Sequence, residues 1–149
     1  MNQQPDLREP RLPFGDARRW LGTLEDARVE ALVSMAGDIV LLIDEDGVIR
    51  DVAGEADLAR DLQDRIGDAW VETVTVESRP KVEDMVARRG TDRWRQITHQ
   101  RPGGDLPVRY MVISLGDRGE MAAIGRDERG AAVLQQRLLQ VQQSLERDY

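Results

Sequence analysis

The pattern of apolar and polar residues is most distinctive between residues 39 and 52. The apolar run Ile39–Ile43 is followed by the acidic turn sequence Asp44–Gly47 and then by a second apolar segment, residues 48–52. An Asp-Gly pair ahead of β-branched residues is typical of a β-hairpin, because glycine takes the positive φ that the turn requires. The pattern therefore predicts two antiparallel strands joined by a tight turn.

Three other segments have apolar residues at helical spacing. They are Val29, Leu32, Val33 and Ala36 before the hairpin, Leu58, Leu62 and Ile66 after it, and Val82, Met85 and Val86 further on. In the third segment Ser78 and Pro80 are typical of a helix start, and Gly90 stands where a helix commonly ends in a left-handed conformation. These segments predict three amphipathic helices.

Alternation with a period of two predicts three more strands, at residues 93–98, 106–115 and 121–124. In the second of these strands, Val108, Tyr110, Val112 and Ser114 share one face. Two strands before the helices and three after them predict an α+β domain, in which a five-stranded antiparallel sheet carries helices on one face. We assign this domain to residues 27–127.

The two ends of the chain differ from this central part. Residues 1–26 combine a Pro-rich lead-in, which we expect to be flexible, with a short helix that Asp16 caps and that carries Trp20. Trp20 and the nearby Leu24 would pack either on the domain's own sheet or against a second copy.

The C-terminal segment, residues 128–149, is rich in glutamine. Its apolar residues recur at alternating spacings of three and four, as in a coiled coil: Ala131, Leu134, Leu138, Val141 and Leu145. We expect a linker helix that continues in a longer chain or contacts a neighbouring domain. A helix folded back on its own sheet is the alternative.

Composition narrows the range of functions. At 149 residues the chain holds one domain of about 100 to 120 residues plus extensions, and a net charge of −7 argues against a nucleic-acid surface. The absence of cysteine excludes disulfides and thiolate chemistry. The longest apolar run is far shorter than the roughly 20 residues that span a bilayer, so we expect a cytoplasmic protein without membrane contact.

No set of residues points to catalysis, to a metal site or to a bound cofactor. His99 is the only histidine, so no histidine cluster is available, and its place at the end of a strand predicts an ordinary surface or turn residue. Haem would need an axial His or Cys, whereas the helix after Ser78 offers only Met85, which we expect in the core. Three Trp, two Tyr and one Phe are too few to stack both faces of a flavin. We expect a non-enzymatic protein with no cofactor.

The order helix, strand, acidic-Gly turn, strand resembles the opening of a PAS domain. In sensory PAS domains, an aspartate and a basic residue at the end of the last strand couple the sheet to the departing helix through an ion pair. The resemblance implies this hinge role for Arg126 and Asp127, and a solvated charge pair is the alternative. It also leaves open a domain that senses a small molecule held between sheet and helices.

Two segments resemble a narrower family. The first is Asp68–Val82, and the second joins residues 125–127 to Leu134–Leu138 and Gln142–Tyr149. Together they are similar to the N-terminal PAS domain and the start of the Gln-rich linker in the PpsR/CrtJ family of photosynthesis-gene repressors, over residues 27–149. The resemblance implies a fragment of a repressor that responds to light or oxygen. An antirepressor or a bacteriophytochrome would be its partner, and a helix-turn-helix outside this fragment would bind DNA.

The expected function is the pairing of two repressor chains in a homodimer or a larger assembly. Three apolar surfaces would lack a partner in a single copy. They are Trp20 with Leu24, the strand face bearing Val108 and Tyr110, and the seam formed by Leu134, Leu138, Val141 and Leu145. The alternative function is the binding of a small molecule in the core.

Overall fold

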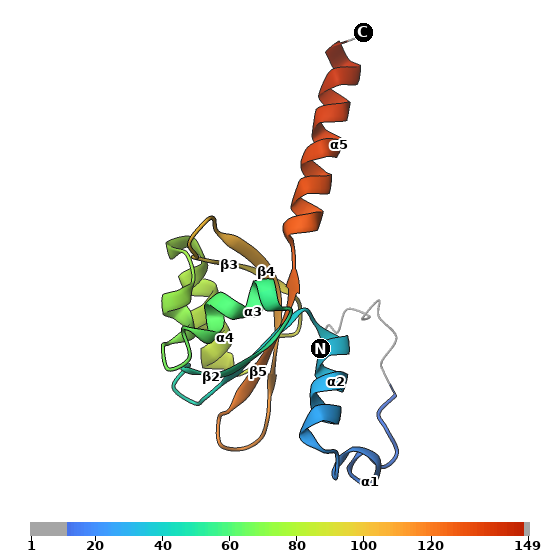
Figure 1. Cartoon of the computed structure of the whole chain (residues 1–149), viewed down its shortest axis with the longest axis vertical. Coiled ribbons are helices and arrows are strands. Elements are labelled where there is room, and N and C mark those ends of the chain that lie inside the picture. The colour runs from blue at the N-terminus through green and yellow to red at the C-terminus, as the bar shows by residue number, and fades with distance from the viewer. Residues whose placement is uncertain (1–11, 148–149) are drawn as a thin grey trace, which may run out of the picture.

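An antiparallel sheet of five strands is the centre of the structure, a computed structural model that describes residues 12–147 except for the side chains of 131–135 and 147 (Figure 1). The order of the strands across the sheet is β2-β1-β5-β4-β3, so the first and last strands of the chain are neighbours at its centre. The strands are β1 Ile39–Ile43, β2 Ile49–Gly54, β3 Arg95–His99, β4 Leu106–Ser114 and β5 Met121–Asp127.

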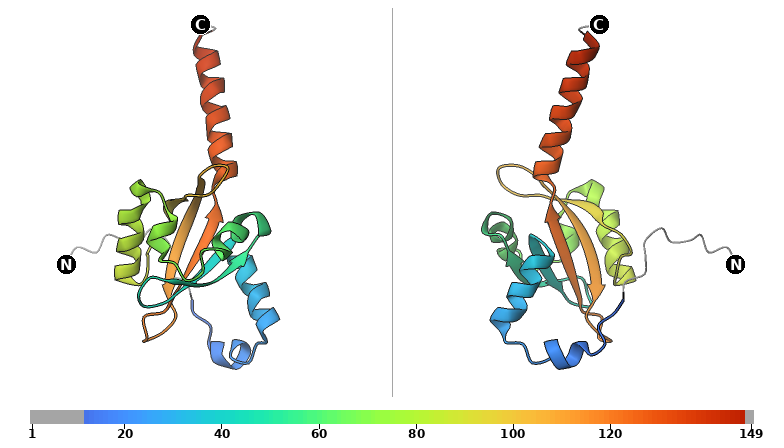
Figure 2. Two further views of the ribbon diagram at one scale, coloured as in Figure 1. Left: turned by 60° about the vertical axis from the view of Figure 1, so that its left-hand side comes forward. Right: turned by 90° about the vertical axis from the view of Figure 1, so that its right-hand side faces the viewer.

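Helices lie on both faces of this sheet. The inner face is covered by α3, α4 and the short 3-10 helices between them, whereas α2 lies on the outer face (Figure 2). The helical elements are α1 Ala17–Leu21, α2 Asp26–Ala36, α3 Ala56–Gln63, η1 Trp70–Thr73, η2 Val76–Ser78, α4 Arg79–Arg88 and α5 Arg129–Arg147. The predicted α+β fold is confirmed. The helix predicted from Val29, Leu32, Val33 and Ala36 forms as α2, but it lies on the sheet face that we expected to be open.

The hairpin between β1 and β2 forms as predicted. Gly47 has φ +82°, and its N–H donates to the carbonyl of Asp44 at 3.0 Å. The Asp44 carboxylate accepts from the backbone N–H groups of Asp46 and Val48 and from Arg50. The carboxylate of Asp44 therefore stabilises the turn through these hydrogen bonds.

The core fills the space between the inner face and the helices. Trp70 and Tyr110 are its largest fully buried side chains, and their rings meet edge to face with centroids 5.2 Å apart. Gly125 lies beneath Tyr110, where an added Cβ would come within 2.7 Å of three side-chain atoms. A residue without a side chain at this point of β5 therefore leaves room for the ring of Tyr110, its partner on β4.

Two details of the helix α4 differ from expectation. Ser78 occupies the N-cap position of α4 as predicted, but its side chain makes no capping hydrogen bond, and its hydroxyl accepts instead from the Thr98 N–H of β3 at 2.9 Å. The left-handed residue at the C-terminal end is Arg89, with φ +54°, and not Gly90. The helix ends one residue early because Thr91 N–H is bonded to the carbonyl of Val112 in the sheet.

The two terminal segments leave the body of the domain in different ways. The side chain of Asp16 accepts from the N–H of Arg19 and caps α1 as predicted, but α1 ends at Leu21, so that Leu24 lies outside the helix. The C-terminal helix α5 extends away from the sheet and does not fold back on it (Figures 1 and 2). Residues 1–11 of the expected lead-in lie outside the described residues. The domain boundaries at 27 and 127 stay a prediction.

Candidate interaction surfaces

His99 is buried in the core, so its predicted position at the surface is wrong. Only 1% of its surface is exposed to solvent, and its ring lies between Thr73 and Tyr110. The period of two that turns Ile97 of β3 inward also turns His99 inward, since the two residues are two positions apart. This signal was present in the sequence, but the usual exposure of histidine outweighed it.

The hydrogen bonds around His99 determine which of its two ring nitrogens carries the proton in the neutral form. Thr73 donates its hydroxyl hydrogen to the carbonyl of Trp70 at 2.7 Å, so the same oxygen accepts from Nδ1–H of His99 at 3.1 Å. The hydroxyl of Tyr110 then donates to Nε2 of His99 at 2.7 Å. Burial lowers the pKa of His99 from 6.5 to about 4 and raises the pKa of Tyr110, so the pair is uncharged at neutral pH.

The space next to His99 is small. A pocket of about 60 Å³ lies under α3, lined in part by Leu58, Leu62, His99 and Leu106. Pockets that hold small organic ligands are typically about 300 to 1,000 Å³. A haem or a flavin at this position would require α3 to move away from the sheet.

The strand face with Val108 and Tyr110 is not an exposed surface. Both side chains have no accessible surface, because β4 directs them inward, beneath Trp70 and the helices of the inner face. The alternation predicted for β4 is correct, but the face it was assigned to is wrong. Their expected role in a dimer interface therefore does not agree with the structure.

The exposed apolar residues of the sheet lie on the outer face. The strand register places Leu42 of β1 beside Ala122 of β5, and Ala122 beside Ile113 of β4. A second row, adjacent to the first, contains Val40, Ile124 and Met111. Leu42, Ile113 and the following Leu115 are exposed. Together these two rows and Leu115 form a continuous apolar surface, which we call the outer apolar surface.

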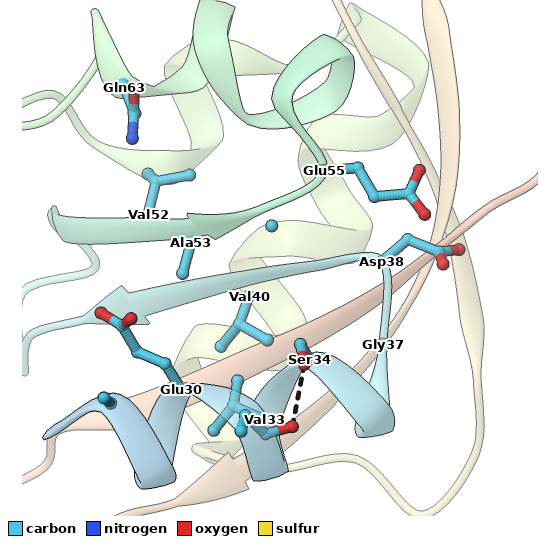
Figure 3. Close-up of a pocket in the computed structure, with 13 residues that line it drawn as sticks. Glu30, Val33, Ser34, Gly37, Asp38, Val40, Val52, Ala53, Glu55 and Gln63 are labelled. Atoms are coloured by element: carbon cyan, nitrogen blue, oxygen red, sulfur yellow. Dashed lines mark hydrogen bonds between the residues drawn. The ribbon is translucent and has the colours of Figure 1, made fainter. Parts of the chain in front are cut away.

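Helix α2 covers this surface only in part. None of its residues is buried, and a groove runs along each side of the helix. The groove shown in Figure 3 has a volume of about 690 Å³, and the carboxylates of Glu30, Asp38 and Glu55 stand around it. The groove on the other side, about 520 Å³, is lined mainly by the outer apolar surface, and we call it the apolar groove.

The N-terminal helix α1 does not cover the outer apolar surface either. Trp20 is 71% exposed, with the guanidinium of Arg19 5.5 Å from the centre of its ring, and Leu24 is half-buried. Whether Trp20 and Leu24 take part in a dimer contact stays a prediction. The structure shows that the tryptophan has the exposure which such a contact needs.

The start of α5 is held by a cluster of charged residues. Arg129, the first residue of α5, contacts the carboxylate of Asp127 at 2.8 Å and that of Asp57 in α3 at 2.7 Å. Asp127 also accepts from the backbone N–H of Arg129 at 2.9 Å. Arg129 lowers the pKa of both carboxyl groups, so all three residues are charged at neutral pH. We call this cluster the α5 clamp.

The hinge role predicted for Arg126 and Asp127 stays a prediction, but the ion pair expected between these two residues is not the one that the structure shows. Asp127 does anchor the departing helix, but its basic partner is Arg129. Adjacent residues of a strand point to opposite faces, so Arg126 projects to the outer face, where its guanidinium lies 4.3 Å from the ring centre of Trp94. The correct partner could not be inferred from β5 alone, because the third member of the clamp, Asp57, is 72 residues away from Arg129.

Most of the predicted seam on α5 is exposed. Leu138, Val141 and Leu145 each expose more than half of their surface, as does the neighbouring Leu139. The side chain of Leu134 lies outside the described residues. Isolated apolar residues at the surface are common, but three at heptad spacing on one helix are typical of a surface that pairs with another helix.

Two further properties concern residues 12–147. None of the helices in this range has both the length and the apolar character required to cross a membrane. Nor does this range bring three or more His, Asp or Glu side chains close enough together to hold a metal ion.

Comparison with known proteins relates the chain to one curated relative and to a known fold. It is 32% identical over 126 residues to Protein CrtJ of Rhodobacter capsulatus, an alignment that covers 79% of this chain and 26% of CrtJ. The chain thus spans about a quarter of the length of that relative. No family model matches the sequence.

Two solved structures have the same fold. One is the PAS domain of an HTR-like protein from Haloarcula marismortui, with a TM-score of 0.52, 24% identity, and coverage of 74% of this chain and 95% of the other. The other is the photoactive yellow protein domain of the sensor histidine kinase Ppr from Rhodospirillum centenum, with a TM-score of 0.52, 15% identity, and coverage of 74% and 99%. At these identities the likeness describes the fold alone.

Proposed function

We propose that this chain, a PAS domain related to CrtJ, is the pairing and signal-transmission module of a transcriptional repressor. It acts through contacts between proteins and not through catalysis. As the resemblance to the PpsR/CrtJ family implies, the repressor would control photosynthesis genes in the cytoplasm in response to light or oxygen. An antirepressor or a bacteriophytochrome would relieve repression, and DNA would be bound by another part of the repressor.

The observation that carries this proposal is the position of α5. The helix extends away from the sheet (Figure 1), and Leu138, Val141 and Leu145, at heptad spacing, are exposed. A parallel helix from a second copy would bury these side chains in a two-stranded coiled coil. At its start, the α5 clamp joins the helix to α3 and to the last strand of the sheet. A change in the PAS body would therefore reach the paired helices through this clamp.

Sedimentation or light scattering of the purified chain tests the pairing. We expect a dimer whose dissociation constant rises strongly in the variant Leu138→Glu/Leu145→Glu, because two carboxylates would face the apolar seam. The matched control Gln136→Glu/Gln143→Glu adds the same charges on the opposite side of α5 and should leave the mass unchanged. If the seam variant and the control associate equally well, α5 is not the pairing element.

A further inference from the structure

The apolar groove beside α2 has an apolar floor and an acidic rim. Leu42, Ile113 and Ala122 of the sheet form the centre of its floor, and Val29 and Val33 of α2 form one wall. The carboxylates at its rim belong to Asp26, Glu30 and Asp51. A segment that combines large apolar side chains with positive charge would match both features.

The described part of the chain contains such a segment in α1. The five residues of this helix include Trp20 and Leu21, which are exposed, and the neighbouring Arg18 and Arg19, which carry positive charge. Tryptophan and arginine are the residue types that most often dominate the energy of protein interfaces. The apolar and charged groups of α1 thus complement those of the apolar groove.

We propose that the apolar groove binds α1 of a second copy of this chain, and that two copies exchange these helices symmetrically. The inference deepens the proposed function, self-association, by naming a second contact and its occupant.

The connection between α1 and α2 explains why a second copy is needed. Only residues 22–25 join the two helices, and this segment is itself hydrogen-bonded: Gly22 N–H donates to Arg18 and Leu24 N–H to Leu21. With this short connection, no residue of α1 lines the apolar groove of its own chain, and Trp20 is 71% exposed. In an exchange with two-fold symmetry, each α1 would fill the groove of the other copy.

The experiment is carried out on the full chain with the α5 seam disabled by Leu138→Glu/Leu145→Glu, so that only other contacts remain. Sedimentation should still detect a dimer. Adding Trp20→Ala or Ile113→Glu should each raise its dissociation constant at least about thirtyfold, as expected for a central interface residue. Met35→Ala is the matched control, because Met35 is an exposed apolar residue of α2 that does not line the groove, and it should have no effect.

Mixing the two defective variants distinguishes exchange from binding within one chain. The Trp20→Ala copy retains an intact groove, and the Ile113→Glu copy retains an intact α1, so an equimolar mixture should form heterodimers that native mass spectrometry identifies by mass. If Ile113→Glu fails to fold, Glu30→Lys/Asp51→Lys takes its place. These charges are exposed at the rim, and Arg18→Glu/Arg19→Glu should restore the contact.

Two results would overturn the inference. One is a seam-disabled chain that is monomeric at high micromolar concentration, and the other is a mixture without heterodimers, which would show that α1 binds its own groove or none. Failure of the proposed α5 pairing appears differently, as equal association of the wild-type and seam-disabled chains. The two proposals can therefore fail independently.

Discussion

On the inner face of the sheet, α3, α4 and Trp70 exclude water from the large apolar side chains of the strands, whereas on the outer face α2 lies across apolar residues without burying any of its own. The same strands contribute to both faces, because alternate residues point in opposite directions. Both faces are apolar, but only the inner one is closed. This difference indicates that stability comes mainly from the inner face and that the outer face is available for contacts.

The strongest test of this comparison is Trp70→Ala, for which we expect a loss of about 3 to 5 kcal/mol in the free energy of unfolding. The indole is fully buried against Tyr110, and its removal would leave a cavity. Leu42→Ala on the outer face is the control and should cost only about 1 kcal/mol, since Leu42 is already 40% exposed. Urea denaturation measures both, and equal losses would contradict the division between the faces.

The second test uses pH, because His99 is buried in its neutral form. Its pKa is lowered from 6.5 in the unfolded chain to about 4 in the fold, so the unfolded chain binds more protons between these values. The contribution of neutral His99 to stability is therefore complete above pH 6.5 and is lost as the pH falls toward 4, by about 3 kcal/mol in total.

Urea denaturation at a series of pH values would reveal this slope. His99→Gln should unfold more easily at neutral pH, but its stability should change much less between pH 6.5 and 4. A wild-type chain whose stability is constant over this interval would contradict the burial of a neutral histidine.

The third test is Gly125→Ala, a substitution that adds one methyl group to the inner face. Its Cβ would lie 2.7 Å from side-chain atoms of Ile39, Tyr110 and Val108, so we expect a loss of about 1 to 3 kcal/mol from overpacking. Gly130→Ala in α5 is the matched control, because nothing lies within 4 Å of its position, and it should be neutral or slightly stabilising. Thermal unfolding of the two variants decides the point.

The smallest effect is expected for Arg129→Gln in the α5 clamp. Because the ion pairs of the clamp are partly exposed to solvent, the midpoint of global unfolding should hardly change. Hydrogen exchange of the backbone amides of Glu128 and Arg129 should, however, become several times faster as the start of α5 loosens. Arg126→Gln, which removes a charge outside the clamp, should leave this exchange unchanged.

The sequence predicted the elements of the fold better than their surroundings. Alternation correctly placed Val108 and Tyr110 on one side of β4, and the Asp-Gly turn and the five strands formed as expected. A period of two cannot tell which face the helices cover, because Leu42 and Ile113 make the opposite face equally apolar. For this reason core residues were assigned to an interface.

The residues of the candidate sites were harder to predict, for physical reasons that differ. His99 was misplaced although its distance of two positions from Ile97 indicated the core. Arg129 was missed because its partner Asp57 comes from a distant helix, and no local pattern encodes an ion pair of that kind. On α5, Leu138, Val141 and Leu145 lie beyond the clamp, where the heptad spacing is a property of the local sequence; their role in pairing stays a prediction.

Asp38, two residues after the end of α2, makes two hydrogen bonds to the C-terminal end of β5. Its N–H donates to the carbonyl of Gly125, and its carboxylate accepts from the N–H of Asp127, each at 2.8 Å. The polypeptide therefore enters β1 and leaves β5 at the same end of these two neighbouring strands. Because its two ends are adjacent, the domain could be inserted between two helices of a longer chain without moving those helices apart. Residues 38–127 could therefore be transferred as one unit from one regulatory protein to another, by natural recombination or by engineering.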